Sequence, residues 1–315
     1  MILIVSYPNY AHVERVVEHL TRPYALFDTG WYPARSLLTV AVKECCESLA
    51  LTTADGEVID LARVGAVWHR RISPMTFDES LTDPTGRLFA WSEANEALLG
   101  LWYSLHCYWM NPPWADEVGQ RKVRQLQLAR SLGLPVPETL ITNDPARARD
   151  FVASHAPGGV VRKAFRNIAE APRETSVVSE ADLRLIDTVR FAPVIFQRFV
   201  PADLDLRVTY VDGELFPAAI RSRPEYQTDY RLGVGHAQVL PYELPDDVAA
   251  RLRRLMDALD LRFGGIDMRV TPEGEHVFLE VNPAGEYLFV TERTGQPVPQ
   301  AIAAALERHD REWGA

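Results

Sequence analysis

Two short segments near the carboxyl end decide the interpretation of this sequence: Gly264-Gly-Ile-Asp267-Met-Arg269 and Phe278-Leu-Glu280-Val-Asn282-Pro-Ala-Gly285. A turn signal separates them, so they are predicted to pair as an antiparallel hairpin. In such a hairpin Asp267 lies opposite the Glu280 region, and Glu280 and Asn282 share one face because strand side chains alternate. Three oxygen donors then converge, and hard oxygen ligands on rigid strands suit a Mg²⁺ ion that bridges nucleotide phosphates.

The alternative is that Asp267 and Glu280 are solvated residues on the outer face of an ordinary hairpin. For an isolated Asp and Glu that interpretation would be preferred. Here, however, Glu280 lies inside an apolar run that ends in Asn-Pro-Ala-Gly, and strand propensity alone does not require such an ending. The sequence therefore favours a metal site.

Composition limits the class of protein. The chain has 315 residues, of which 47% are hydrophobic and 24% are charged, a balance typical of globular proteins and not of disordered or fibrous ones. A chain of this length is expected to fold as two or three lobes that share a cleft. The net charge of −10 argues against general nucleic-acid binding.

The location is expected to be the cytoplasm, with no membrane partner. No apolar run approaches the roughly 20 residues that span a bilayer, and the amino terminus lacks the pattern of a signal peptide. The three cysteines, Cys45, Cys46 and Cys107, have no CxxC spacing, which favours a reduced compartment and no structural zinc. Cys45 and Cys46 are predicted to lie on a helix, at core or boundary positions.

Lysine is rare in this chain. Of the 33 basic residues only Lys43, Lys122 and Lys163 are lysines, which indicates a coding preference for arginine. A lysine that remains is a candidate for a role that a compact ammonium group performs and a planar guanidinium does not. The alternative is that Lys122 is a solvated helix residue and Lys163 an edge-strand residue.

The predicted fold class is α/β and α+β, in three parts. Residues 1–112 form an amino-terminal α/β domain that ends at Asn111-Pro-Pro, residues 113–193 a linker helix and a central small lobe, and residues 194–315 a carboxyl-terminal lobe. The linker helix is expected to begin with Asp116 as its N-cap and to end at Gly133. Strands are expected at 2–5, 66–68, 139–142, 160–165, 175–178, 194–199, 206–211, 215–220, 265–270 and 276–281, and further helices at 12–20, from Pro145 to about 155, at 246–259 and at 298–309.

Over nearly its whole length the sequence resembles ATP-grasp carboxylate ligases, and among them the graspetide (microviridin-type) macrocyclases of ribosomal peptides. The segment from Lys122 to Pro145 is similar to the family's linker helix and the start of its small lobe, and Val160-Val-Arg-Lys163 to its phosphate-binding strand. The other matching motifs are Gln197-Arg-Phe-Val200, Asp205-Leu-Arg-Val208, the triad Asp267, Glu280 and Asn282, and Val67-Trp-His-Arg-Arg71. His69 departs from the tyrosine that is usual in the last motif.

The resemblance implies an ATP-grasp fold with ATP in the interlobe cleft and Mg²⁺ on Asp267, Glu280 and Asn282. Lys122 and Lys163 would contact the α- and β-phosphates, and Gln197–Val200 would form the hinge that holds adenine. There the backbone of Arg198 and Val200 would read the base while Phe199 packs nearby. Asp205 would accept from a ribose hydroxyl, unless it merely pairs with Arg207 on a surface strand.

Arginines are expected to complete the site. Arg207 and Arg231 are candidates to clamp the γ-phosphate and an acyl phosphate, because planar fork donors suit spread charge. Arg269, Arg221 and Arg223 could do the same or bind an acidic substrate.

The activity implied by the resemblance is ligation within a precursor peptide. An Asp or Glu side chain would be activated as an acyl phosphate and joined to Thr, Ser or Lys as a macrocyclic ω-ester or ω-amide. The partners would be the leader and core of that peptide and a second copy of the enzyme. Two alternatives stay open: a RimK-like or glutathione-synthetase-like ligase that forms a linear amide, and a non-catalytic nucleotide-binding module.

Overall fold

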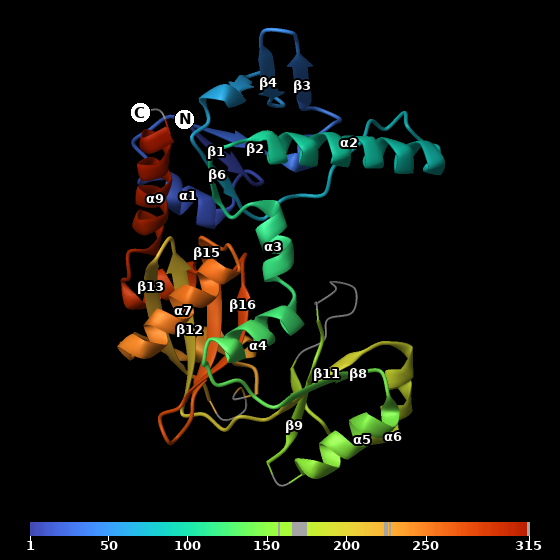
Figure 1. Ribbon diagram of the computed structural model, residues 1–315, viewed down its shortest axis with the longest axis vertical. Helices are drawn as coiled ribbons and strands as arrows, with labels where there is room; N and C mark the ends of the chain where they lie inside the picture. Colours follow the sequence, from blue (N-terminus) through green and yellow to red (C-terminus); the bar gives the residue numbers. More distant parts are fainter. Residues whose placement is uncertain (157, 166–174, 224–225, 227, 314–315) are drawn as a thin grey trace.

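The computed structural model describes residues 1–156, 158–165, 175–223, 226 and 228–313. Along the long axis of the molecule, an amino-terminal domain is followed by a helical linker beside a larger antiparallel sheet, and then by a small antiparallel sheet at the far end (Figure 1). The last helix returns to the amino-terminal domain, where the ammonium group of Met1 donates to Asp310 at 2.6 Å. None of the described helices combines the length and the apolar composition that a bilayer crossing requires.

The amino-terminal sheet is parallel and contains, in spatial order, β2 (Tyr24–Phe27), β1 (Ile2–Val5), β6 (Ala66–His69) and β7 (Tyr108–Met110). All four residues of β1 are buried, as is usual for a parallel strand covered on both faces. Apolar side chains of α1 (Ala11–Val17) and α9 (Val298–Trp313) pack on one face, and those of α2 (Pro84–Ser104) on the other. The predicted strands at 2–5 and 66–68 are confirmed.

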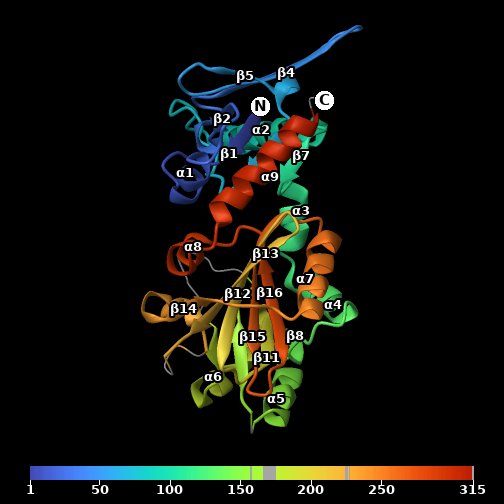
Figure 2. The same ribbon diagram turned by 90° about the vertical axis from the view of Figure 1, so that its left-hand side faces the viewer.

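A three-stranded sheet projects from this domain (Figure 2). It contains β3 (Leu37–Val42), β4 (Glu47–Thr52) and β5 (Val58–Asp60). Cys45 and Cys46 are exposed in the turn between β3 and β4, where the N–H of Lys43 donates to the carbonyl of Cys46 at 2.9 Å. The predicted helix is therefore wrong here, because the flanking segments are rich in residues that favour strands, such as Val40 and Val42.

The linker consists of two helices, α3 (Pro113–Gly119) and α4 (Lys122–Ser131), and not of the single helix predicted from Asp116. The helix is interrupted after Gly119, which lies so close to the large lobe that a Cβ atom would come within 3.0 Å of Leu261. The side-chain amide of Gln125 donates to the Gly119 carbonyl that the interruption leaves free. The predicted stop at Gly133 is confirmed by its positive φ of 79°.

The small lobe is an antiparallel sheet of β10 (Ser176–Val177), β9 (Val160–Lys163), β11 (Val194–Arg198) and β8 (Thr139–Thr142), in that order. It carries α5 (Pro145–Ser154) and α6 (Glu180–Arg184). Asp144 caps α5 by accepting from the N–H of Ala146 at 2.8 Å, with Pro145 in the first turn. The predicted strand that begins at Val160 is shorter than expected and ends at Lys163.

The large lobe is an antiparallel sheet of β14 (Gln238–Pro241), β13 (Glu214–Arg221), β12 (Leu204–Val211), β15 (Phe263–Val270) and β16 (His276–Asn282), in that order. The helices that accompany this sheet are α7 (Asp246–Ala258) and α8 (Leu288–Thr294). On β12 and β15, Leu206, Val208, Ile266 and Met268 pack in one apolar cluster with α7. Because strand side chains alternate, residues 205, 207, 267 and 269 lie on the opposite face, toward the small lobe.

Short 3₁₀ helices connect these elements. They are η1 (Thr29–Trp31), η2 (Leu61–Arg63), η3 (Ile186–Phe191), η5 (Tyr230–Leu232) and η6 (Val234–His236).

Candidate active site

Two buried ion pairs cross the cleft face of the large sheet. In the register of β12 and β15, Arg207 lies opposite Asp267, and Asp205 lies opposite Arg269. Nη1 of Arg207 donates to both carboxylate oxygens of Asp267 at 3.0 Å, and Nε of Arg269 donates to Asp205 at 2.9 Å. The alternation that buries the apolar core on one face thus places four charged side chains on the other.

The predicted pairing of the terminal hairpin is confirmed. Asp267 of β15 lies directly opposite Glu280 of β16, and Gly265 lies opposite Asn282. A bulge between Asp267 and Met268 shifts the register for the rest of the hairpin.

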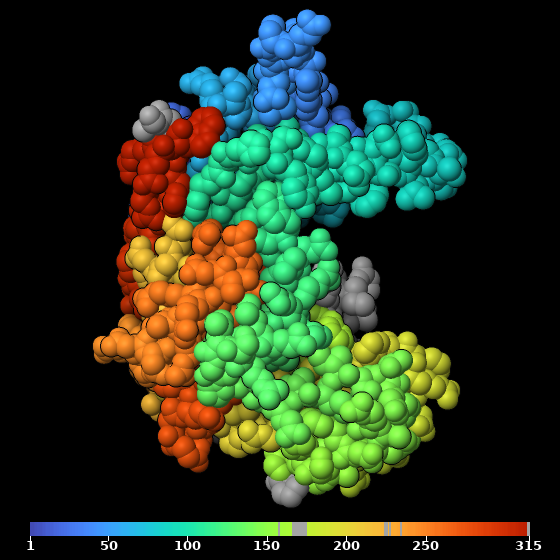
Figure 3. All heavy atoms as spheres, viewed as in Figure 1, coloured from blue at the N-terminus to red at the C-terminus, as the bar shows by residue number. Residues whose placement is uncertain are grey.

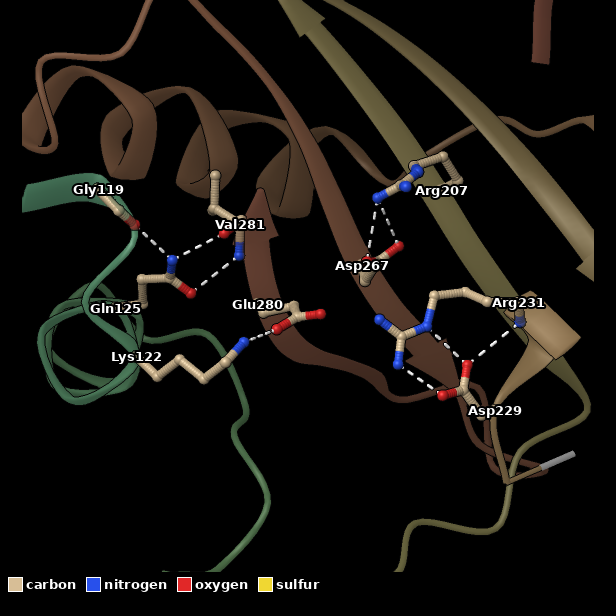
Figure 4. Close-up of polar contacts among 9 residues, drawn as sticks. All are labelled: Gly119, Lys122, Gln125, Arg207, Asp229, Arg231, Asp267, Glu280 and Val281. Carbon is tan, nitrogen blue, oxygen red and sulfur yellow. Dashed lines mark hydrogen bonds and ion pairs between the residues drawn. The ribbon is translucent and has the colours of Figure 1, made fainter. Parts of the chain in front are cut away.

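The two candidate lysines meet at Glu280. Lys122, at the start of α4, donates its ammonium group to Glu280, as Figure 4 shows. Lys163, at the end of β9, reaches the same cleft from the small lobe. Burial opposes ionisation of Glu280, but the charges of Lys122 and Lys163 outweigh it and hold its pKa at about 2. The same burial, with further cations nearby, lowers the pKa of Lys163 to about 8.

A 3₁₀ turn closes one side of the site. Asp229 caps η5 and holds the guanidinium group of Arg231 by hydrogen bonds of 2.7 Å to Nε and 2.5 Å to Nη2 (Figure 4). Between them, the hydroxyl of Tyr230 donates to Oδ1 of Asp267 at 2.8 Å. Burial raises the pKa of Tyr230 well above its ordinary value, so this hydroxyl is a donor at neutral pH.

These groups line a cleft with two adjoining chambers, which share Lys163, Thr175, Arg231 and Glu280. Figure 3 shows that the surface of the molecule is hollowed between α2 and the small lobe. We call the chamber lined by the hinge residues 197–200 the inner chamber. The chamber lined by Lys122, Asn282 and Pro283 is the outer chamber. The predicted residues on the inner chamber are Lys163, Gln197, Arg198, Phe199, Val200, Asp205, Arg231, Asp267, Arg269 and Glu280, and those on the outer chamber are Lys122, Lys163, Arg231, Glu280 and Asn282.

The hinge differs in detail from the prediction. The N–H of Arg198 donates to the carbonyl of Glu138 at 2.9 Å, so it belongs to the small-lobe sheet and is not free to read a base. The carbonyl of Val200 accepts from Nη1 of Arg269 at 2.7 Å, and Arg269 also lies over the ring of Phe199. The N–H of Phe199 donates to the carbonyl of Gly159 at 3.0 Å, and the assignment of this hinge to adenine stays a prediction.

Asp205 is buried and paired with Arg269, not with Arg207, so the alternative of a pair with its strand neighbour is wrong. Side chains two apart on a strand share a face, but the cross-strand partner is closer. Burial, only partly offset by Arg269, raises the pKa of Asp205 to about 6.

Arg207 does not occupy the position expected of a phosphate clamp. Its side chain is only 7% exposed, lies behind Asp267, and is absent from the described residues that line either chamber. Arg221 and Arg223 are exposed and are likewise not among those lining residues. Of the arginines expected to clamp phosphate, Arg231, whose side chain is 47% exposed, and Arg269 line the cleft.

The donors available to a divalent cation are two carboxylates and an amide. Within the described part of the chain no group of three or more His, Cys, Asp or Glu side chains is arranged so that it could hold a metal ion without other ligands. Asp267 and Glu280 face each other across two strands, and Asn282 follows on β16. This all-oxygen set fits magnesium, which keeps several waters and takes one or two carboxylates.

The motif Trp68-His69-Arg70-Arg71 ties the amino-terminal sheet to the loop after β16. Arg70 is 2% exposed, lies over the ring of Phe263 and donates to the carbonyl of Gly285 at 2.8 Å. Arg71 pairs with Glu286 at 2.6 Å. β16, which carries Glu280 and Asn282, therefore continues directly into the domain junction.

Sequence reasoning missed three residues of the site. Tyr230 contacts Asp267, 37 positions away, and no local pattern reveals that contact, whereas Asp229 lies only two residues from its partner Arg231. Gln125 is 1% exposed, accepts from the N–H of Val281 and donates to its carbonyl, and so fastens α4 beside Glu280 (Figure 4). Polar and apolar residues are interspersed along α4, so the sequence gives only a weak signal that this glutamine is buried.

Known proteins resemble both the amino-terminal part and the whole chain. Residues 1–117 match a family model described as the MvdD pre-ATP-grasp domain. A search of curated proteins gave no match. The macrocyclase MdnC from Microcystis aeruginosa MRC, solved with the precursor peptide MdnA, is 30% identical, with a TM-score of 0.87 over 98% of this chain and 99% of that chain.

Two further structures are similar over nearly their full length. The RiPP-associated ATP-grasp ligase of Chryseobacterium gregarium, in complex with ADP and a leader and core peptide, is 26% identical, with a TM-score of 0.89 over 98% of this chain and 96% of that chain. The ATP-grasp ligase PsnB, in complex with a minimal precursor, Mg and ADP, is 27% identical, with a TM-score of 0.77 over 98% of both chains.

The fold and the interlobe cleft define an ATP-grasp ligase, which confirms the predicted fold and enzyme class. Within that class the chain belongs to the family of the macrocyclase MdnC. The resemblance drawn from the sequence is therefore confirmed, whereas the roles of individual residues stay predictions.

Proposed function

We propose that this enzyme uses ATP to activate Asp or Glu side chains of a ribosomal precursor peptide and joins them to Thr, Ser or Lys side chains as macrocyclic ω-esters or ω-amides. The observation that carries the proposal is the meeting of Lys122, Lys163, Asp267 and Glu280 in one interlobe cleft. It is supported by full-length similarity to ligases solved with precursor peptides.

The reaction has two steps. An oxygen of the peptide carboxylate attacks the γ-phosphorus of ATP, which forms an acyl phosphate and releases ADP. A hydroxyl or amine of the same peptide then attacks the acyl carbon, loses its proton and displaces inorganic phosphate. The sum is one water removed from the peptide for each ring and one ATP converted to ADP and phosphate.

The residues of the cleft suit these steps. The ammonium groups of Lys122 and Lys163 would contact the phosphates, where two point charges offset the anionic chain. The hinge at Phe199 and Val200 would hold the base, and Asp205 would accept from the ribose. Arg231 and Arg269 would stabilise charge on the transferred phosphoryl group.

Magnesium would be held by Asp267, Glu280 and Asn282. Their oxygens fit this ion and face the chamber boundary where both lysines meet. When bound, it neutralises charge on the phosphates and orients them for transfer. Arg207 would act behind this set by holding Asp267.

The inner chamber would take the nucleotide and the outer chamber the reacting side chains of the peptide. The leader is proposed to dock beside the small lobe, and the metal to lie in the large lobe. The small-lobe sheet includes β11 (Val194–Arg198), so the small lobe extends past the predicted boundary at residue 193. The domain of residues 1–112 would shape the peptide side of the cleft through Arg70 and Arg71. We further propose that the enzyme acts in the cytoplasm as a homodimer and binds neither nucleic acid nor membranes.

The test is incubation of the enzyme with ATP, Mg²⁺ and the precursor peptide encoded by a neighbouring gene. Mass spectrometry should show loss of one water for each ring, with fragmentation suppressed across the ring, together with ADP release. Glu280→Gln should abolish both, while Glu273→Gln, at the exposed turn of the same hairpin, should retain both. An unchanged peptide mass would refute the macrocyclase assignment, and absence of ADP release from the unaltered enzyme would indicate a binding module.

A further inference from the structure

Tyr230 makes the two oxygens of the Asp267 carboxylate unequal. Oδ1 accepts from the Tyr230 hydroxyl at 2.8 Å and from Nη1 of Arg207 at 3.0 Å, whereas among the described residues only Nη1 of Arg207 donates to Oδ2, also at 3.0 Å. A carboxylate oxygen offers about two lone-pair directions. Those of Oδ1 are both used within the protein, and Oδ2 keeps one.

Arg207 alone could not create this difference, because a single nitrogen donates equally to both oxygens. The carboxylate could then turn about its χ2 torsion and present either oxygen to the cleft. The tyrosine hydroxyl removes that freedom, since it can bond only the oxygen on its own side.

The tyrosine itself is firmly held. Its ring is 8% exposed and packs in a separate apolar cluster with Ala218, Ile220, Val239 and Val290 of the large lobe. The hydroxyl therefore approaches Asp267 from a fixed position, and the adjacent Arg231 is placed over the cleft by the same turn.

We propose that Tyr230 is a positioning residue that directs Oδ2 of Asp267 toward the divalent cation. This inference rests on the proposed function, because it concerns the carboxylate assigned there to magnesium. Residues that orient metal-binding carboxylates by hydrogen bonds commonly change metal affinity by about ten- to a hundred-fold when they are substituted.

The test uses the full-length protein, ADP and Mn²⁺, whose free form is counted by electron paramagnetic resonance. Tyr230→Phe keeps the packed ring and removes only the hydroxyl. We expect it to weaken Mn²⁺ binding in the presence of ADP by about ten-fold or more. ADP binding in the presence of a metal chelator should be unchanged, which a general loss of structure would not allow.

Tyr242→Phe is the matched control, because its hydroxyl makes a comparable bond of 2.9 Å to His276. This bond lies outside both chambers of the cleft. Equal Mn²⁺ affinity in Tyr230→Phe and the unaltered enzyme would overturn the inference, as would an equal loss in both variants. If the unaltered enzyme bound no Mn²⁺ with ADP, the proposed function would fail instead, so the two failures are distinguishable.

Discussion

Nucleotide affinity should fall as the pH rises above 8, and Lys163 should be the cause. Burial, with Lys122, Arg269 and Arg231 nearby, lowers the pKa of this lysine to about 8 despite the opposing charge of Glu280. A lysine in an unfolded chain has a pKa of about 10.4. Anionic phosphates bound beside the Lys163 ammonium group would favour its charged form. Lys163 should therefore keep its proton to a higher pH in the nucleotide-bound enzyme than in the free enzyme.

The size of the effect follows from proton linkage. At about pH 7 the free enzyme already carries the ammonium group, and affinity should not depend on pH there. Above pH 8 a proton must be taken up on binding, and each further pH unit should weaken binding by about ten-fold until the bound form also titrates. The stability of the fold should change with pH in the opposite direction to nucleotide affinity. Between about pH 8 and 10.4 the unfolded chain holds its proton on Lys163 more often than the folded chain does. The destabilisation caused by burying this lysine therefore disappears as the pH rises through that range.

Isothermal titration of ADP between about pH 7 and 9.5, in buffers of different ionisation enthalpy, measures both affinity and proton uptake. Uptake should appear above pH 8 in the unaltered enzyme. Lys163→Met should bind more weakly at neutral pH and show no such uptake, whereas Lys43→Met, on the exposed β3–β4 turn, should match the unaltered enzyme. A flat affinity up to pH 9.5, or an undiminished slope in Lys163→Met, would refute the reasoning.

Three further substitutions test contacts that support the site or the fold. Gln125→Ala should lower the free energy of unfolding by about 2 to 4 kcal/mol in urea titrations, because it leaves buried backbone groups of Gly119 and Val281 without partners. Asp310→Ala should lower the free energy of unfolding by about 1.5 to 3 kcal/mol at neutral pH, since it removes the carboxylate that pairs with the ammonium group of Met1 and with Arg22. Its ionic bonds lower the pKa of Asp310, so the difference from the unaltered enzyme should shrink as the pH falls through that lowered pKa. Gly285→Ala should lower the rate of ADP release while the free energy of unfolding in urea titrations changes little. The new Cβ atom would lie 2.8 Å from the Gly265 nitrogen and would displace the loop that follows Asn282.

The features predicted from sequence are those encoded in local patterns. The alternation of strand side chains and a turn signal sufficed to predict the pairing of Asp267 with Glu280. The rarity of lysine in the chain singled out Lys122 and Lys163. Tyr230 contacts a residue 37 positions away and Gln125 one 156 positions away, through geometry that only the folded chain creates. The linker helix was predicted as continuous for the same reason, because its interruption depends on the approach of Gly119 to the large lobe.

Arg207 shows a different limit of sequence reasoning. Its place on the strand and its facing side were predictable from alternation, but its burial behind Asp267 was not. The type of a residue and the sheet face on which it lies define which ion-pair partners are possible. Which partner it contacts depends on the residue opposite it on the neighbouring strand. The sequence therefore predicts the set of charged groups in the cleft better than the role of each.

The most direct measurement follows a heavy oxygen isotope placed in the side-chain carboxylates of the precursor peptide. If the enzyme forms an acyl phosphate, one labelled oxygen must leave with the phosphate for each ring, and mass spectrometry of the released inorganic phosphate should show it. Labelled phosphate together with a peptide lighter by one water is the predicted result. Phosphate that carries no label, released while the peptide closes its rings, would contradict the account.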